Sequence, residues 1–205
     1  MPVRWLLIDL FQTHHIKFDE SEVKFDKHGR TTPEYHKISP KGRVPALIID
    51  GKTLVTESIA IMLLLAERHP EADLAPVARN PARSLYLETM VFLANTMLPS
   101  FRDYWYGSQD GRAEDEKAIK YLAVTHFELG WDLLDEQLEG KAFLMGESPT
   151  VADFMLVCMV IWVKNIPTDP LKRQNLRRLV REMMERESWK EFKEKEHLQF
   201  EIPEV

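Results

Sequence analysis

Hydrophobic positions near the start of the chain follow a helical spacing. Val3, Leu6, Leu7 and Leu10 fall at i, i+3, i+4 and i+7, which is typical of one face of an amphipathic helix. From residue 21 to 25 the pattern changes, because hydrophobic and charged side chains alternate with the period of a strand. The two patterns predict a helix followed by a strand.

The next segment predicts a short helix, a hairpin and a longer helix. Thr32 and Pro33 have the residue types of a helix cap and of a first helical position. Asp50-Gly51 separates the hydrophobic runs 46–49 and 53–55, which is a strong hairpin signal. A second helical stripe follows the hairpin at Ile59, Met62, Leu63 and Ala66.

From about Arg79 onward, every hydrophobic pattern is helical. Two long stripes are Leu87, Met90, Val91, Ala94, Met97, Leu98 and Phe101, and then Ile119, Leu122, His126, Leu129 and Leu133. Pro99 should bend the first of these helices near Asn95, whose carbonyl loses its hydrogen-bond donor. Thr150 and Asp153 have the spacing of a capping box, which predicts the start of a further helix.

The change from mixed to helical patterns predicts two domains. We expect an α/β domain over residues 1–72 and an all-α domain over residues 79–205, joined by a linker at about 70–78. On its apolar stripe, His126 is expected to be a core or interdomain histidine, with a role in a cleft as the alternative. His14 and His15 are adjacent and diverge, so we expect exposed turn residues and no metal.

Composition argues against several classes of function. A formal charge of −6 and a pI near 5.7 disfavour nucleic acid as a partner, and the basic run 172–181 is interpreted as a solvated helix face. The only cysteine, Cys158, rules out an internal disulfide and is expected to be a small buried residue. The longest apolar stretch, 154–163, is half the length of a membrane span of about 20 residues. A cytoplasmic location away from membranes is expected.

The segment 38–47 contains the first part of a candidate binding site. Val44-Pro45 leads into a predicted strand, and an X-Pro bond at such a place suits the cis form. A cis bond would turn the N–H and C=O of Val44 outward, where they could pair with one extended peptide. An ordinary trans turn at the start of a strand is the alternative interpretation.

The second part of the candidate site is the start of the third predicted helix. Free N–H groups and the helix dipole favour an anion there, and the Ser58 hydroxyl adds a donor. Glu57 can accept an ammonium, so the pair matches the head group of an amino acid, with a plain helix cap as the alternative. Lys41 and Arg43 could meet a second carboxylate at the far end of a bound peptide, and taken alone they are surface cations. Together these residues predict a site for an acidic tripeptide with a carboxylate at each end.

The order Ser-Pro-Lys-Gly-Arg-Val-Pro at 39–45, a hairpin, and Glu-Ser-Ile-Ala-Ile at 57–61 resembles the glutathione site of glutathione transferases. The segment 143–153 is similar to the start of the folding-core helix of that family. The resemblance implies a thioredoxin-like N-terminal domain, a helical C-terminal domain and a homodimer. It also implies a glutathione site that comprises Lys41, Arg43, Val44, Pro45, Glu57 and Ser58.

The activity implied by the resemblance is conjugation of the glutathione thiolate to a small hydrophobic electrophile, a detoxification reaction. Phe101, Tyr104 and Trp105 are core or dimer contacts on their pattern alone, whereas the resemblance places them beside the electrophile pocket. A different function is a non-catalytic binding or regulatory role, as in some bacterial stress-response proteins of this fold.

The catalytic residue is not assigned. In the family it follows a strand that precedes the first helix, and the stripe at residues 3–10 is similar to that helix. Strand and catalytic residue are therefore expected before Met1, with two alternatives: the first segment forms a strand, or the chain is a shortened, inactive relative. Thr13 lies at the wrong end of the helix, and Cys158 belongs to the distal domain.

Overall fold

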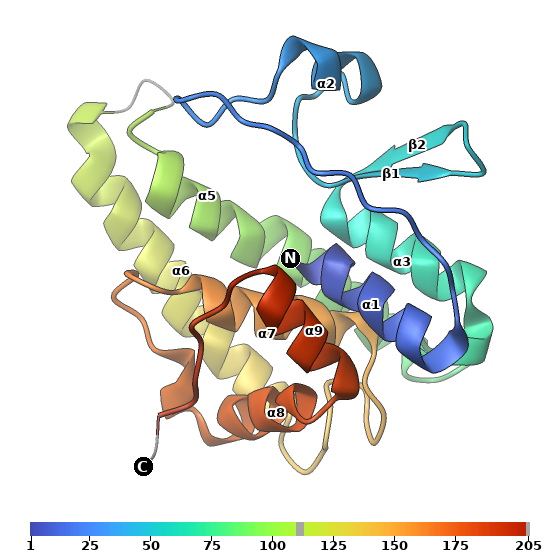
Figure 1. Cartoon of the computed structure of the whole chain (residues 1–205). Coiled ribbons are helices and arrows are strands. Elements are labelled where there is room, and N and C mark those ends of the chain that lie inside the picture. Colours follow the sequence, from blue (N-terminus) through green and yellow to red (C-terminus); the bar gives the residue numbers. More distant parts are fainter. Residues whose placement is uncertain (110–112, 204–205) are drawn as a thin grey trace.

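The computed structural model describes residues 1–109 and 113–203 (Figure 1). The N-terminal part contains α1 (Pro2–His14), α2 (Pro33–Ile38), β1 (Ala46–Ile49), β2 (Thr53–Thr56) and α3 (Ser58–Arg68). The first segment is a helix, so the alternative in which it forms a strand is wrong. The two strands are antiparallel and pair Ala46 with Thr56 at one end and Ile49 with Thr53 at the other. Asp50 and Gly51 form the turn with φ values of 55° and 70°, as the Asp-Gly signal predicts.

The predicted strand at 21–25 is wrong. Residues 15–24 have no regular structure, and only an isolated bridge joins Phe25 to Thr31. Alternation alone does not make a strand, because its N–H and C=O groups need a neighbouring strand, and the described chain places none beside it. The segment instead runs as a long extended trace past the hairpin before it reaches α2 (Figure 1).

Among the described residues, the regular elements of the C-terminal part are helices joined by loops, with one isolated bridge between Phe143 and Gly146. Its helices are α4 (Arg83–Phe92), α5 (Leu98–Tyr106), α6 (Glu116–Gln137), α7 (Val151–Trp162), α8 (Gln174–Met184) and α9 (Glu187–Lys195). A π-helical segment, η2 (Leu93–Met97), joins α4 to α5. It lies where Pro99 removes a donor from the helix ladder, at the position where a bend was predicted near Asn95. Short 3-10 turns are η1 (Pro70–Ala72), η3 (Ala113–Asp115) and η4 (Pro170–Lys172).

The core is continuous from the N-terminal part to the C-terminal part. Eleven of the residues of α7, from Val151 to Ile161, are buried, and the helix contacts α1, α3, α4 and α8. α1 also packs along α9. Between the two parts, the carbonyl of buried Leu74 accepts a hydrogen bond from Val151 N–H at 3.0 Å. The predicted domain boundary at 70–78 stays a prediction.

A buried polar cluster joins α1 to the last helices. The carboxylate of Asp9 is 2% exposed and accepts two hydrogen bonds from the Arg186 guanidinium, at 2.9 and 2.7 Å. The Ser188 hydroxyl donates to the same carboxylate at 2.6 Å and accepts from the Trp5 indole N–H at 3.1 Å. Segments about 180 positions apart in the sequence are thus held together by the Asp9–Arg186 ion pair, and the polar groups of the cluster have hydrogen-bond partners.

The apolar stripe on α6 faces outward, contrary to expectation. Leu122, Leu129 and Leu133 are exposed, and so is His126, which is therefore neither a core nor an interdomain histidine. The buried face of α6 is the adjacent one, made by Ala123, Phe127, Gly130, Trp131 and Leu134. Both faces are apolar, so the periodicity did not indicate which of them packs against the neighbouring helices.

The basic run 172–181 is used within the fold. Arg178 donates to the carbonyls of Leu138 and Ala142 at 3.1 Å each, beyond the end of α6. Arg177 donates to the carbonyl of Pro203. These contacts join α8 to the segment after α6 and to the C-terminal segment.

Candidate functional site

The loop between α2 and β1 is held from its inner side. The Tyr35 hydroxyl donates to the carbonyl of Arg43 at 2.9 Å, and the Thr31 hydroxyl donates to the carbonyl of Gly42 at 3.0 Å. Gly42 has φ 59°, and an added Cβ would lie 2.3 Å from the His36 ring, so only glycine fits there. These contacts fix the backbone that leads into Val44, a supporting role for Tyr35 and Thr31 that the sequence did not indicate.

Val44 is half exposed and lies just before the first strand. The Val44-Pro45 peptide bond is cis, as predicted. The residue is 50% exposed, and among the described residues neither its N–H nor its C=O has a hydrogen-bond partner. β1 begins two positions later at Ala46. A free backbone donor and acceptor beside the start of a strand can pair with an extended peptide.

The start of α3 is an open helix terminus. Glu57 precedes the helix with φ 73°, an uncommon conformation for a residue with a side chain, and makes no side-chain cap. The Ser58 hydroxyl is half-buried and has no partner in the described part of the chain. The first N–H groups of α3 and this hydroxyl together are donors for one carboxylate.

The two basic residues of the loop have different surroundings. Lys41 Nζ lies 2.7 Å from the Glu57 carboxylate, so Lys41 belongs to the end of the site where an amino-acid head group was expected. This differs from the expectation that Lys41 would meet the far carboxylate. The Arg43 side chain is exposed and pairs with no acid in the ranges that the structure covers, so it is available to a second carboxylate.

The three aromatic residues expected at the electrophile pocket differ in exposure. Phe101 is buried and its ring packs on Phe127 and Trp162, with centroids at 4.5 and 5.8 Å. Trp105 is 39% exposed, and Tyr104 donates from its hydroxyl to the carbonyl of Asn165 at 3.3 Å. Phe101 therefore supports the surface from below, whereas Tyr104 and Trp105 reach it.

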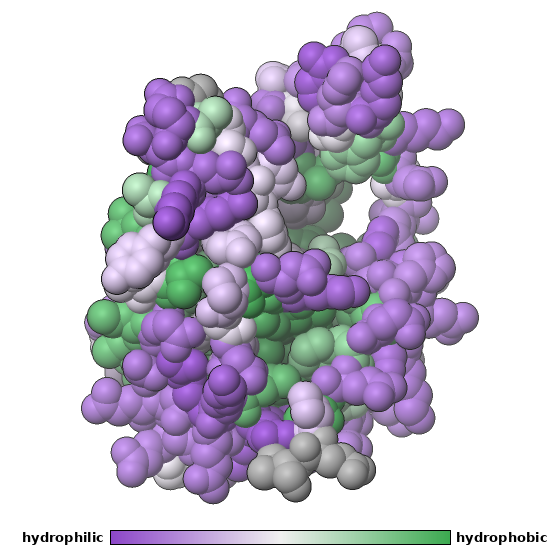
Figure 2. All heavy atoms as spheres, turned by 90° about the vertical axis from the view of Figure 1, so that its left-hand side faces the viewer, coloured by the Kyte–Doolittle hydropathy of each residue, from purple (hydrophilic) through white to green (hydrophobic). Residues whose placement is uncertain are grey.

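The side of the molecule that carries α5 and α6 is hollowed along its middle (Figure 2). The floor of the hollow is hydrophobic, and its margins are mostly hydrophilic. A hydrophobic floor with a few polar groups at its edge is typical of a surface that accepts a small apolar molecule.

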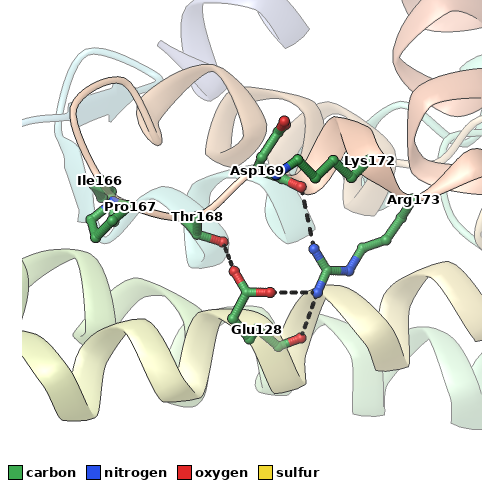
Figure 3. A pocket seen from close by; sticks show the side chains of 7 residues that line it. All are labelled: Glu128, Ile166, Pro167, Thr168, Asp169, Lys172 and Arg173. Carbon is green, nitrogen blue, oxygen red and sulfur yellow. Dashed lines mark hydrogen bonds and ion pairs between the residues drawn. The ribbon is translucent and has the colours of Figure 1, made fainter. Parts of the chain in front are cut away.

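A separate polar pocket lies between α6 and the loop after α7 (Figure 3). Burial disfavours the charge of Glu128, but hydrogen bonds from Arg173 and Thr168 outweigh it and hold the pKa of this carboxyl below its usual range. Arg173 also donates to Asp132 at 2.8 Å and to the carbonyl of Asp169 at 3.3 Å. The charges of Glu128 and Arg173 compensate each other. We therefore interpret the residues that line this pocket as contacts that hold the loop after α7 against α6.

The Cys158 thiol and the Thr13 hydroxyl are engaged within the fold and are not available as nucleophiles. Cys158 lies inside α7, and burial raises the pKa of its thiol to about 12, so the thiolate is not available at neutral pH. The Thr13 hydroxyl donates to the carbonyl of Asp9 at 2.7 Å. Among the described residues, no group of acids, histidines and cysteines is arranged to hold a metal ion, and no helix is long and apolar enough to span a membrane.

Two domain models of one family match most of the chain. The model of the glutathione S-transferase N-terminal domain matches residues 3–68, and that of the C-terminal domain matches residues 82–182. Glutathione S-transferase GstA of Escherichia coli O157:H7 is 25% identical over 153 residues, which cover 75% of this chain and 73% of GstA. The uncharacterised GST-like protein YncG of Escherichia coli K12 is 27% identical over 138 residues, 67% of this chain and 66% of YncG.

Solved structures share the fold over nearly the whole chain. A glutathione transferase homologue from Sulfitobacter, with bound glutathione, has a TM-score of 0.83 at 23% identity and covers 96% of this chain and 94% of its own. A sphingomonad glutathione S-transferase complexed with glutathione has a TM-score of 0.77 at 25% identity, with 95% and 94% covered.

Proposed function

The chain belongs to the glutathione S-transferase family, with the predicted thioredoxin-like and all-α parts, and from this premise we propose that it binds glutathione. The free backbone edge of Val44 pairs with the cysteinyl unit, next to Pro45. Glu57 and Ser58 hold the γ-glutamyl head group, and Arg43 meets the glycine carboxylate. The observation that carries the proposal is the adjacency of the unpaired Val44 edge to the open start of α3.

Removing the Ser58 hydroxyl should weaken glutathione binding. A hydrogen bond to a charged acceptor is worth about 1.5–3 kcal/mol, so we expect Ser58→Ala to raise the dissociation constant roughly tenfold to a hundredfold. Isothermal titration calorimetry measures this change, and Ser21→Ala, an exposed serine in the extended segment, is the matched control. Equal affinities of wild type and Ser58→Ala would place the head group elsewhere.

The reaction proposed for the bound thiol is conjugation to a small hydrophobic electrophile, in the cytoplasm, as a detoxification step. The hydrophobic hollow beside α5, the half-buried Tyr104 and the exposed Trp105 support this substrate class. Thiolate formation needs a donor near the sulfur, since a free thiol has a pKa of about 8.5. Because no catalytic donor is assigned among the described residues, we expect the protein to bind glutathione but to conjugate slowly.

A second candidate is a non-catalytic, glutathione-binding role in regulation or stress response. It is favoured by the placement of Thr13, Tyr35 and Cys158, whose hydroxyls and thiol are either hydrogen-bonded within the fold or buried. A turnover assay with a generic aromatic electrophile separates the two functions. Measurable turnover would eliminate the second candidate, and rates ordinary for the family would also contradict the expected slow conjugation. Binding without turnover would support the second candidate.

We also propose that the protein forms a homodimer through the outward face of α6. Leu129 and Leu133 are more than half exposed there, and exposed Leu87 and Val91 lie on α4, which hydrogen bonds between Thr89 and Gln137 join to α6. Contiguous apolar side chains on a helical surface indicate an interface, and a two-fold pairing matches apolar surface with itself.

A charge in this face should separate the two copies. Leu129→Glu would bury a carboxylate twice in the interface, so we expect a monomer by light scattering at concentrations where the wild type is a dimer. Val77→Glu changes a similarly exposed side chain in the linker and should leave the mass of the particle unchanged. A wild-type protein that is monomeric at all accessible concentrations would contradict the proposal.

A further inference from the structure

Lys41 and Glu57 form an ion pair within the head-group end of the site. The Lys41 ammonium lies 2.7 Å from Glu57 Oε1, although the two residues are 16 positions apart. No other cation of the described chain pairs with Glu57. The acid proposed to receive the ammonium of the ligand is thus already paired with an ammonium of the protein.

Both partners of this ion pair are largely in water. The Lys41 side chain is 59% exposed and the Glu57 side chain is 68% exposed. Exposed pairs of this kind are weak, because water and salt screen them and long side chains lose freedom when they pair. The lysine can therefore leave Glu57 at little cost when a ligand ammonium arrives, and return when the ligand has none.

We propose that Lys41 is a built-in substitute for the ammonium of the ligand head group. The inference rests on the proposed glutathione site and adds a substrate class to it. A peptide with a free amine displaces Lys41 from Glu57. When an acidic peptide lacks the amine, Lys41 stays beside Glu57 and continues to compensate its negative charge. The site therefore accepts γ-glutamyl-like peptides without a free amine, such as deaminated or N-acylated ones, and the solvent beside Glu57 leaves room for an acyl group.

The experiment compares two ligands on several variants by calorimetry. The ligands are glutathione and deaminoglutathione, in which hydrogen replaces the α-amino group. The quantity measured is the dissociation constant of deaminoglutathione divided by that of glutathione. A general loss of affinity on removing a positive charge affects both constants and cancels in this ratio. The variants are Lys41→Met, Lys41→Arg and Glu57→Gln, with Lys37→Met, an exposed lysine on α2, as the matched control.

The wild type should bind deaminoglutathione within about threefold of glutathione. In Lys41→Met the amine-free ligand leaves Glu57 without a cation, so the ratio should rise about fivefold, equivalent to about 1 kcal/mol. Lys41→Arg and Lys37→Met should keep the wild-type ratio. In the Glu57→Gln background, Lys41→Met should no longer change the ratio of dissociation constants. High salt should reduce the fivefold rise that Lys41→Met causes in the otherwise wild-type protein.

The outcomes separate this inference from the proposed function. A ratio that is the same in wild type and Lys41→Met would overturn the substitute role while glutathione binding stands. A wild type that rejects deaminoglutathione by fiftyfold or more would overturn it as well. A wild type that does not bind glutathione would overturn the proposed function and this inference together.

Discussion

Replacing Arg186 with alanine is expected to destabilise the protein by about 3 kcal/mol, because a buried charge loses its partner. Asp9 is 2% exposed, and two of its three side-chain hydrogen bonds come from the Arg186 guanidinium. The arginine is 25% exposed, so we expect the lower end of the range measured for fully buried pairs. Urea unfolding, followed by circular dichroism, measures the change in the free energy of unfolding.

Two further variants test the cause of the loss. Arg181→Ala removes an exposed arginine of α8 and should change the free energy of unfolding by less than about 0.5 kcal/mol. Asp9→Asn in the Arg186→Ala background removes the uncompensated charge and should recover part of the stability. An Arg186→Ala protein as stable as the wild type would show that the ion pair does not hold α1 to the C-terminal helices.

The second large effect is expected at Asp153, which accepts three hydrogen bonds at the start of α7. The donors are the N–H of Leu144 at 2.9 Å, the N–H of Thr150 at 2.7 Å and the Thr150 hydroxyl at 3.0 Å. Asp153→Ala leaves these buried donors without partners, so we expect a loss of about 3 kcal/mol or more. Asp169→Ala removes an exposed cap from η4 and is the matched control, with a loss of at most about 1 kcal/mol.

The contribution of Asp153 should also depend on pH. Burial raises the pKa of this carboxyl from 3.8 to about 6, and the hydrogen bonds from Leu144 and Thr150 only partly oppose that rise. Because the folded pKa is the higher one, the stabilisation is complete below about pH 4 and is lost as the pH rises through 6. The whole change is about 3 kcal/mol, at 1.36 kcal/mol for each pKa unit.

Comparison with Asp153→Asn isolates this titration, because the amide is neutral at every pH. The free energy of unfolding of the wild type, minus that of Asp153→Asn, should fall by about 2 kcal/mol between pH 4 and pH 7.5, the rest of the change lying below pH 4. A difference that stays constant over this interval, or that rises, would contradict the direction of the pKa shift.

Features that depend on neighbouring residues were predicted correctly. The Asp50-Gly51 hairpin needs two residues that tolerate positive φ, and the capping box of Thr150 and Asp153 needs two side chains at a spacing of three. The interruption before Pro99 follows from one missing N–H group. In each case the atoms that determine the structure lie within a few positions of each other.

Features that depend on distant partners were not predictable. The alternation at 21–25 matches a strand, but the hydrogen bonds of a strand come from elsewhere in the chain, and no strand lies beside it in the described structure. Both adjacent faces of α6 are apolar, and only the packing of α5, η2 and α8 on α6 decided that Phe127 is buried and Leu129 is not. The pairing of Lys41 with Glu57 likewise required the loop and the helix to be placed in space.

By itself, the sequence determined the order of most elements and the residue types that line the candidate site, and it indicated the cis bond before Pro45 with a trans turn as the alternative. Only the tertiary structure decided which surface of α6 is exposed, which cation compensates Glu57, and that Asp9 and Arg186 meet across the core. The physical reason is that backbone propensities and caps act over one or two helical turns. Burial and ion pairing, in contrast, depend on side chains brought together from distant parts of the chain.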